Sequence, residues 1–307
     1  MSVYTPCTPE QVEIWLKPVG LGTVCSLEPV LHGVQNSNYR LLTDRGEWVL
    51  TFYEQASPAR VADDLGLMHA LAGHGLPVPD PLPQPDGALF RWFLDKPAAI
   101  LPWLPGQHEQ DISCATVTQL GQTVAQLHEL MATWKNGSAH AKGHEWRQWV
   151  FSELQPKLNP EELTIVLWAN DVDRQWQADL SSLPRQMIHA DLFRDNVLWQ
   201  HGQISALLDF YEAGYEVRLF ELAVIINEWC CRPDGQCDSD RADAFLHAYQ
   251  QRLPLTGLEL RCLQPMRVIA ALRFYLSRRM ASLQPQQDGV LQKDPAEFLR
   301  ILQHLQA

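Results

Sequence analysis

Three polar side chains near the middle of the chain have the residue types and the spacing of a phosphoryl-transfer site. Asp191 stands five residues before Asn196, and Asp209 follows a short apolar run at 204–208. Phosphoryl transfer needs a base or orienting group for the attacking hydroxyl, and oxygen ligands that hold Mg²⁺ on the nucleotide phosphates. We therefore predict that Asp191 is the catalytic base and that Asn196 and Asp209 are the metal ligands.

An alternative is that these side chains are ordinary turn formers between two strands, because Asp and Asn are common in turns. The Asp-x-x-x-x-Asn spacing alone would favour that alternative. Its context favours a kinase-type catalytic loop. His189 stands two residues before Asp191, a short apolar strand at 197–199 follows, and a turn at Gly202 leads to a second strand that ends at Asp209. We expect His189 to brace this loop through hydrogen bonds to the backbone, not to act in catalysis.

The same residues resemble the aminoglycoside phosphotransferase-like kinases, which have a protein-kinase-like fold and phosphorylate hydroxyl groups of small molecules. The loop His-x-Asp-x-x-x-x-Asn of those kinases stands here at 189–196, and their hydrophobic-Asp-aromatic element stands at 208–210. A narrower resemblance, to the type II homoserine kinases, is carried by the segments 36–39, 75–79, 189–196, 209–211, 227–230 and 271–278. It covers nearly the whole chain and implies ATP and Mg²⁺ as cofactors and L-homoserine as the substrate.

The pattern of strands and helices along the rest of the chain predicts an α+β, two-lobed protein-kinase-like fold. Strand-like segments at about 24–31, 39–43, 47–53, 88–93 and 98–101 predict an antiparallel sheet of about five strands. Helical patterns cover about 9–17, 58–72, 115–134, 146–158, 161–180, 217–231, 239–251, 257–283 and 296–305. The segment 102–106, Pro-Trp-Leu-Pro-Gly, is the strongest linker signal. We therefore place a nucleotide-binding lobe at 1–103 and a larger, mainly helical catalytic and substrate-binding lobe at 104–307.

The resemblance also implies where the nucleotide binds. In two-lobed kinases adenine bonds to the backbone of the linker, and the first hairpin covers the phosphates. The residues that this implies as nucleotide contacts are Asn36, Ser37 and Asn38 in the hairpin and Leu101 and Trp103 at the linker. Taken alone, the turn at 32–38 has one glycine and is more typical of a polar hairpin turn than of a phosphate-binding loop.

One position departs from the protein-kinase pattern, which places a lysine on the third strand to hold the phosphates. The corresponding residue here is Thr51, which carries no charge. Either another cation, such as Arg40, Arg60 or Lys96, takes that role, or the phosphates depend on Mg²⁺ and backbone donors.

The substrate carboxylate would match the planar fork of an arginine. Arg273 and Arg278 lie in a largely apolar segment, 271–278, and point about 140° apart on a helix, so we expect one of them, Arg273 by preference, to bind that carboxylate. An arginine that pairs with an acid and braces the C-terminal helices is an equally open alternative for each. Arg194, inside the loop, would bind a phosphate or a carboxylate, or pair with an acid.

Two acids are candidates for the substrate ammonium group. Glu228 and Glu221 lie seven residues apart and share one face of a helix. We assign Glu228 to the substrate ammonium, and the open alternative is that both carboxylates are simply solvated.

The composition excludes several partners. The 307 residues carry 24 Lys and Arg against 36 Asp and Glu, a net charge of −12, without a basic run, so nucleic acid and anionic membranes are not expected as partners. No apolar run is long enough to span a membrane, and the N-terminal segment does not resemble a signal peptide. Seven cysteines, with one adjacent pair at 230–231, fit neither a metal motif nor a disulfide framework, so we expect a reduced, cytoplasmic protein. The sequence makes no prediction of oligomeric state.

The expected activity is ATP-dependent phosphorylation of the side-chain hydroxyl of L-homoserine, which yields O-phospho-L-homoserine for threonine biosynthesis. One alternative is a kinase of the same fold that acts on another amino alcohol or on an aminoglycoside. Another is a kinase-like binding protein without turnover, which the uncharged Thr51 would suit. The presence of Asp191, Asn196 and Asp209 together argues against the binding protein.

Overall fold

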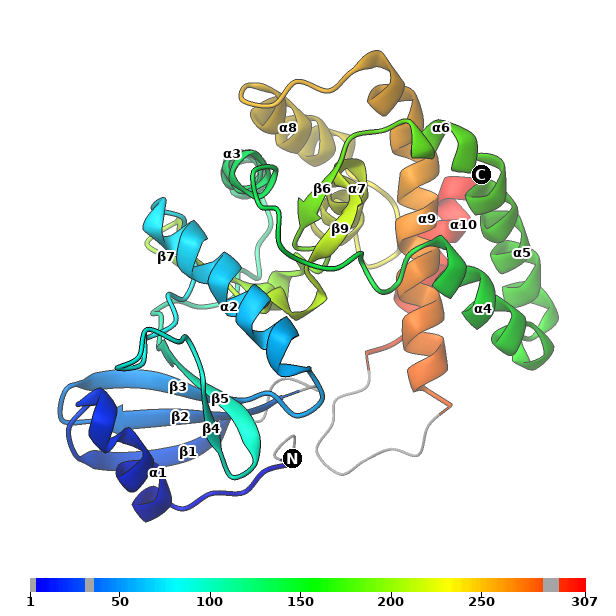
Figure 1. Ribbon diagram of the computed structural model, residues 1–307. Coiled ribbons are helices and arrows are strands. Elements are labelled where there is room, and N and C mark those ends of the chain that lie inside the picture. Colours follow the sequence, from blue (N-terminus) through cyan, green and yellow to red (C-terminus); the bar gives the residue numbers. More distant parts are fainter. Residues whose placement is uncertain (1–3, 31–35, 284–292) are drawn as a thin grey trace. The chain divides into compact units, whose positions relative to one another are not determined.

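The computed structural model describes residues 4–30, 36–283 and 293–307. Its contacts divide the described chain into two compact units, one that ends at Pro105 and one that begins at Gly106 (Figure 1). We call them unit 1 and unit 2.

Unit 1 is built on one antiparallel sheet of five strands in the order β1-β2-β3-β5-β4. The strands are β1 (Val24–Val30), β2 (Ser37–Thr43), β3 (Gly46–Phe52), β4 (Arg91–Phe93) and β5 (Lys96–Pro102), and the helices are α1 (Pro9–Leu16) and α2 (Pro58–Gly73). The predicted five-stranded sheet is confirmed, although β4 is shorter than expected. The predicted position 31 of the first strand lies outside the described residues.

Alternation of side chains explains how the sheet forms its core. In β2, Tyr39 and Leu41 are buried while their neighbours are more exposed, as expected for a strand with one covered face. Leu50, Phe52 and Ile100 complete a core that also includes side chains of α1. Helix α1 begins with the expected capping box, in which Thr8 and Gln11 bond reciprocally to each other's backbone amide.

Unit 2 is mainly helical and holds two small two-stranded sheets, β6–β9 and β7–β8. Its helices are α3 (Cys114–Met131), α4 (His144–Leu154), α5 (Pro160–Gln175), α6 (Gln177–Ser181), α7 (Arg218–Trp229), α8 (Ser239–Gln250), α9 (Gly257–Ala281) and α10 (Ala296–Gln306). Its strands are β6 (Arg185–Ile188), β7 (Val197–Gln200), β8 (Gln203–Leu207) and β9 (Gly214–Val217). Strands β6 and β9 were not predicted, and the expected helix at 161–180 is divided into α5 and α6.

Helix α9 is the centre of unit 2, where it contacts α4, α5, α6, α7 and α10 (Figure 1). Most of its middle turns are buried, including the charged Arg267 and Arg273. The α+β class expected from the sequence, with a five-stranded antiparallel sheet in unit 1 and mainly helices in unit 2, is confirmed. Among the described residues, no helix combines the length and apolar character that crossing a bilayer requires.

Candidate active site

A buried carboxylate from α7 holds the candidate catalytic loop. The loop begins directly after β6, and the amides of His189 and Ala190 donate to the two oxygens of Glu221, at 3.1 and 3.0 Å. His128 Nε2 bonds to the same carboxylate at 2.7 Å. Burial raises the pKa of Glu221, but the hydrogen bonds from His128 and the loop outweigh it and lower that pKa overall. Glu221 is fully buried, so the expectation that it is solvated or faces the substrate is wrong.

His189 braces the loop, as expected. Its Nδ1 accepts the amide hydrogen of Asp191 at 3.3 Å, which leaves Nε2 to donate to the Leu208 carbonyl at 2.8 Å. The ring also packs against Phe210, with 4.5 Å between centroids. His189 therefore ties the loop that carries Asp191 to the chain segment that delivers Asp209.

The loop and the β7–β8 hairpin bring the three predicted phosphoryl-transfer residues to one region. Asn196 Nδ2 donates to the carbonyl of Asp191 at 2.7 Å and to its Oδ2 at 3.2 Å. The Asn196 carbonyl accepts the amide of Leu208 at 2.8 Å, which places Asn196 beside the segment that leads into Asp209. Asp209 has a left-handed backbone, with φ 62° and ψ 68°, and its Oδ1 accepts the Tyr211 amide at 3.4 Å.

Two carboxylates in this region repel each other. Desolvation raises the pKa of Asp191, and the positive charge of Arg273 offsets part of that effect. Asp209 reaches solvent, yet enough protein surrounds it for desolvation to raise its pKa, and the Asp191 charge raises it further. A cation between the two carboxylates would relieve this repulsion.

An ion-pair cluster around Glu212 lies beside Asp191 and was not predicted. Glu212 Oε1 pairs with Lys142 Nζ at 2.6 Å, and its Oε2 pairs with Arg273 Nη2 at 2.9 Å. His140 Nε2 lies 3.8 Å from the same Oε2. Burial raises the pKa of Glu212, but His140, Arg273 and Lys142 together hold it well below its usual range.

The cluster changes the interpretation of Arg273. Its side chain is 2% exposed and already paired with Glu212, so the structure favours the alternative left open by the sequence, an arginine held by an acid. Burial lowers the pKa of Arg273, but its pairing with Glu212 and the charge of Asp191 act in the opposite direction. Arg273 thus acts on Asp191 as a nearby charge from within the core, and its assignment as the carboxylate ligand stays a prediction that this burial and pairing disfavour.

The other three predicted substrate residues gather in a second charged group. Arg194 Nη2 donates to the Glu228 carbonyl at 2.7 Å, and Arg194 Nε lies 3.6 Å from Glu228 Oε1. Arg278 pairs with Glu297 at 2.5 Å. Burial and the Glu297 charge raise the pKa of Glu228 to about 7, against the charges of Arg194, Arg278 and Lys293. Glu228 is therefore not an ordinary solvated carboxylate.

Lys293 also belongs to this group, although no sequence pattern pointed to it. Its ammonium pairs with Asp195 at 2.6 Å, and its charge acts on both Asp191 and Glu228. Asp195, which lies inside the catalytic loop, therefore accepts a hydrogen bond from a lysine 98 residues further along the chain.

The predicted nucleotide contacts in unit 1 are partly occupied by other partners. The fully buried Ser37 hydroxyl donates to Glu54 at 2.5 Å and accepts the amides of Tyr4 and Thr5, so only its backbone remains for a ligand. The Trp103 amide donates to the Glu47 carbonyl at 3.1 Å, which leaves its carbonyl and ring. Leu101 pairs with Val49 in the sheet. Among the described residues, the buried Asn36 Oδ1 has no hydrogen-bond partner.

Thr51 has a structural partner within the hairpin. Its hydroxyl donates to Asn38 Oδ1 at 2.7 Å, so it orients a side chain of the predicted phosphate cover. The three candidate replacement cations are each paired with an acid of unit 1: Arg40 with Glu47, Arg60 with Asp64, and Lys96 with Glu54. The structure thus offers no unpaired cation among these three.

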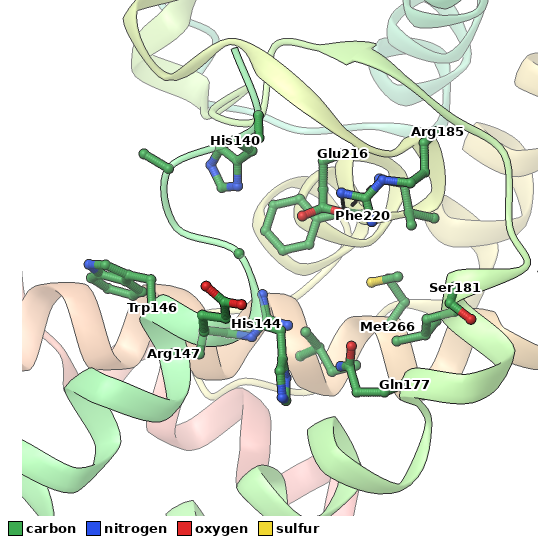
Figure 2. Close-up of a pocket in the computed structure, with 17 residues that line it drawn as sticks. His140, His144, Trp146, Arg147, Gln177, Ser181, Arg185, Glu216, Phe220 and Met266 are labelled. Atoms are coloured by element: carbon green, nitrogen blue, oxygen red, sulfur yellow. Dashed lines mark hydrogen bonds and ion pairs between the residues drawn. The ribbon is translucent and has the colours of Figure 1, made fainter.

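A separate cavity of about 610 Å³ lies in unit 2, between α4, α6, β9 and α9 (Figure 2). Arg185 and Glu216 form an ion pair on one side of it, and His144 and Arg147 of α4 lie on another. Arg185 stands at the start of β6, whereas the catalytic loop follows the end of that strand, and none of the three phosphoryl-transfer residues lines the cavity. We therefore place the candidate active site at the loop and not in this cavity.

Comparison with known proteins agrees with this geometry. The model of the Phosphotransferase enzyme family matches residues 26–255. A protein named homoserine kinase from Methylobacillus flagellatus is 36% identical, over 99% of this chain and 95% of its own length. Others with that name, from Paraburkholderia phymatum and Polaromonas naphthalenivorans, are 35% and 33% identical, each over 98% of this chain and 97% of its own length.

Solved structures share the fold at lower identity. An amicoumacin kinase in complex with AMP-PNP and Ca²⁺ superimposes with a TM-score of 0.70 at 16% identity, over 95% of this chain and 92% of that one. A microcompartment-associated aminopropanol kinase gives the same TM-score and identity, over 96% and 94%.

Proposed function

The chain belongs to the phosphotransferase enzyme family, and from this premise we propose that it is an ATP-dependent kinase that phosphorylates the side-chain hydroxyl of L-homoserine. The product is O-phospho-L-homoserine, an intermediate of threonine biosynthesis. The arrangement of Asp191, Asn196 and Asp209 on one loop and one hairpin supports the reaction type. The substrate rests on relatives named homoserine kinase that match over nearly their full length.

Asp191 is the proposed base for the homoserine hydroxyl. Its carboxylate is oriented by Asn196 Nδ2, and the amide bonds to Glu221 fix the backbone just before it. The raised pKa of Asp191 makes it a stronger proton acceptor than an exposed aspartate, while the Arg273 charge partly offsets that shift and favours the ionised form. Deprotonation strengthens the hydroxyl as a nucleophile for the γ-phosphate.

The same region fits a magnesium ion. The Asn196 amide nitrogen faces Asp191, so its Oδ1, which bonds to none of the described residues, remains as an oxygen ligand. Asp209 would supply the second ligand. Desolvation and the Asp191 charge raise its pKa, and a bound cation would oppose both effects. Mg²⁺ is commonly held by one or two side chains together with substrate phosphates. When bound, Mg²⁺ would neutralise charge on the β- and γ-phosphates.

For the nucleotide, we propose contacts from Asn36, Asn38 and the backbones of Ser37, Leu101 and Trp103. The Thr51 hydroxyl supports this set because it holds the Asn38 side chain in one orientation. Backbone groups and Mg²⁺, in place of a third-strand lysine, then hold the phosphates.

For the amino acid, we propose the charged group at the end of α7. Arg194 and Arg278 supply guanidinium forks for the carboxylate, and ionised Glu228 accepts the ammonium. Arg218, on α7, donates to both oxygens of Glu259, from Nε at 2.7 Å and from Nη2 at 3.0 Å, so its guanidinium fork is already occupied. Arg273 remains important by fixing Glu212 next to Asp191.

A coupled assay of ADP release tests the substrate. It would compare L-homoserine, L-serine, L-threonine, choline, 1-amino-2-propanol and an aminoglycoside at equal concentrations. We expect the highest kcat/KM for L-homoserine. A higher value for a substrate without a carboxylate would contradict the assignment, and ADP release that no acceptor stimulates would indicate a protein without this kinase activity.

A further inference from the structure

The chain reverses direction just after α7, and this turn brings two cysteines opposite each other. Cys231 and Cys237 form an isolated antiparallel bridge. One backbone hydrogen bond flanks the pair on each side, from Arg232 N to Gln236 O at 2.9 Å and from Asp238 N to Cys230 O at 2.7 Å. Because these bonds join the neighbours, Cys231 and Cys237 are a non-hydrogen-bonded pair.

This type of pair has the backbone geometry of a disulfide. Directly opposed residues of a non-hydrogen-bonded antiparallel pair have Cα atoms about 4.5 Å apart, and their side chains leave the same face. Disulfides bridge Cα atoms that are about 4.4–6.8 Å apart. All seven cysteines are free thiols in this structure, so the two sulfurs face each other without a bond. A disulfide between Cys231 and Cys237 therefore needs no movement of the backbone.

The surroundings of the pair favour one thiolate. The Cys231 thiol and the Arg267 guanidinium lower the pKa of Cys237 to about 6, although burial opposes them. The same contact with Cys237, together with burial, raises the pKa of Cys231. Arg267 Nη2 lies 3.5 Å from Cys231 Sγ, and its Nε donates to Asn227 at 3.1 Å, which fixes the guanidinium at the pair.

The two sulfurs also differ in exposure. Cys231 is 5% exposed, whereas Cys237 is only half-buried. A reactive cysteine is an accessible thiolate near a cation, and Cys237 meets that description. Cys231 is more buried and is the second thiol of the pair. The adjacent Cys230 is fully buried, and burial raises the pKa of its thiol, so it is not the favoured nucleophile.

We propose that Cys231 and Cys237 are a dithiol site that small-molecule disulfides oxidise reversibly to an intramolecular disulfide. The Cys237 thiolate attacks one sulfur of oxidised glutathione, which forms a mixed disulfide and releases one glutathione thiolate. Cys231 then loses its proton to solvent and attacks the Cys237 sulfur, which releases the second glutathione thiolate. Two electrons pass from the dithiol to oxidised glutathione, and the two released thiolates take up protons.

The site adjoins the candidate active site along the chain. Trp229, two residues before Cys231, donates its indole N–H to the Leu192 carbonyl of the catalytic loop at 2.9 Å. The Glu228 carbonyl accepts Arg194. A disulfide at 231–237 would therefore fix the end of the helix that holds the catalytic loop.

Alkylation and mass spectrometry test the proposal. The reduced full-length protein is incubated with oxidised glutathione, quenched with acid, alkylated with N-ethylmaleimide and mapped by peptide mass. We expect an intact mass lower by two hydrogens before alkylation, two fewer alkylated thiols, and a cross-link between Cys231 and Cys237. Dithiothreitol should restore all seven thiols.

Single serine variants assign the order of the steps. Cys231→Ser should stop at a glutathione adduct on Cys237, and Cys237→Ser should slow oxidation in this segment by at least about tenfold, because Cys231 is mostly protonated. Cys262→Ser is the matched control, since Cys262 is also buried but lies on α9, outside the segment 231–237. This variant should form the disulfide between Cys231 and Cys237 as the wild type does. A cross-link to Cys230 instead, or seven free thiols in the treated wild type, would overturn the proposal.

Discussion

Replacing Glu221 with glutamine keeps the size of the side chain but removes its charge and one of its two acceptor oxygens. In the native protein both oxygens are used, because one accepts the Ala190 amide and the other accepts the His189 amide and faces His128 Nε2. Whichever way the new amide turns, an NH₂ group meets a buried N–H donor. The variant Glu221→Gln therefore leaves a donor of the catalytic loop or of His128 unsatisfied.

The size of the effect follows from these contacts. A hydrogen bond to a charged group contributes about 1.5–3 kcal/mol, and a buried donor left without a partner costs about 1–3 kcal/mol. We expect Glu221→Gln to lower the free energy of unfolding by about 3–5 kcal/mol and to lower kcat, since the displaced backbone carries Asp191.

The same carboxylate predicts a pH dependence. The folded-state pKa of Glu221 is lowered, so its contribution to stability is present above its unfolded pKa of about 4.3 and is lost as pH falls through the folded value. The glutamine variant does not titrate. The difference in stability between wild type and variant should therefore shrink as the pH falls below about 4.

Urea unfolding with kcat measured on the same preparations tests this prediction. The midpoint should fall while the m-value stays constant, because the exposed surface does not change. Glu153→Gln is the matched control, since Glu153 is an exposed acid on α4 of the same unit, and its effect should stay within about 0.5 kcal/mol. A loss of less than about 1 kcal/mol in Glu221→Gln, with normal kcat, would refute the role given to this carboxylate.

Three further variants test other parts of the site. Asp209→Ala should abolish activity, with little rescue by excess Mg²⁺ and little change in metal-free binding of a fluorescent ATP analogue; rescue to wild-type rates would remove Asp209 from the metal site. Thr51→Ala should cost less than about tenfold in kcat/KM, because its hydroxyl orients Asn38 but carries no charge, and a loss as large as that of Asp209→Ala would show a direct role. Because the pKa of Glu228 is about 7, KM for homoserine should rise as pH falls below 7, when that carboxylate becomes protonated. Glu228→Gln should remove this dependence, and an unchanged pH profile would exclude Glu228 as the ammonium ligand.

Much of the fold could be predicted because its elements are long and periodic. The capping box at Thr8, the alternation in β2 and the apolar repeats of α3 each follow from local physical rules. Strands β6 and β9 have four residues each, too few for alternation to be recognised, and their pairing joins segments that are far apart in the chain. The phosphoryl-transfer residues were found for a different reason, since their spacing lies within one loop and hairpin.

The partners of the charged residues could not be predicted, because they depend on contacts between distant segments. In the sequence, Glu221 looks like an acid on the exposed face of a helix. In the fold it is buried and bonded to His128, which is also buried and lies 93 residues earlier. Arg273 pairs with Glu212, which lies 61 residues earlier in the chain, and the Ser37 hydroxyl donates to Glu54, which lies 17 residues later. Only the folded chain shows that these polar groups are already satisfied, which shifts the substrate assignment from Arg273 to Arg194 and Arg278.

The most direct test of the central claim is the formation of O-phospho-L-homoserine, followed by ³¹P NMR, by the wild type and by Asp191→Asn. The change is nearly isosteric, so the fold should be retained, as circular dichroism would verify. We expect the wild type to form product with ATP, Mg²⁺ and L-homoserine, and the variant to do so at a rate lower by about 10²-fold or more, the scale of a positioned proton acceptor. A correctly folded Asp191→Asn protein with near-normal product formation, or a wild type that forms no phosphohomoserine, would contradict it.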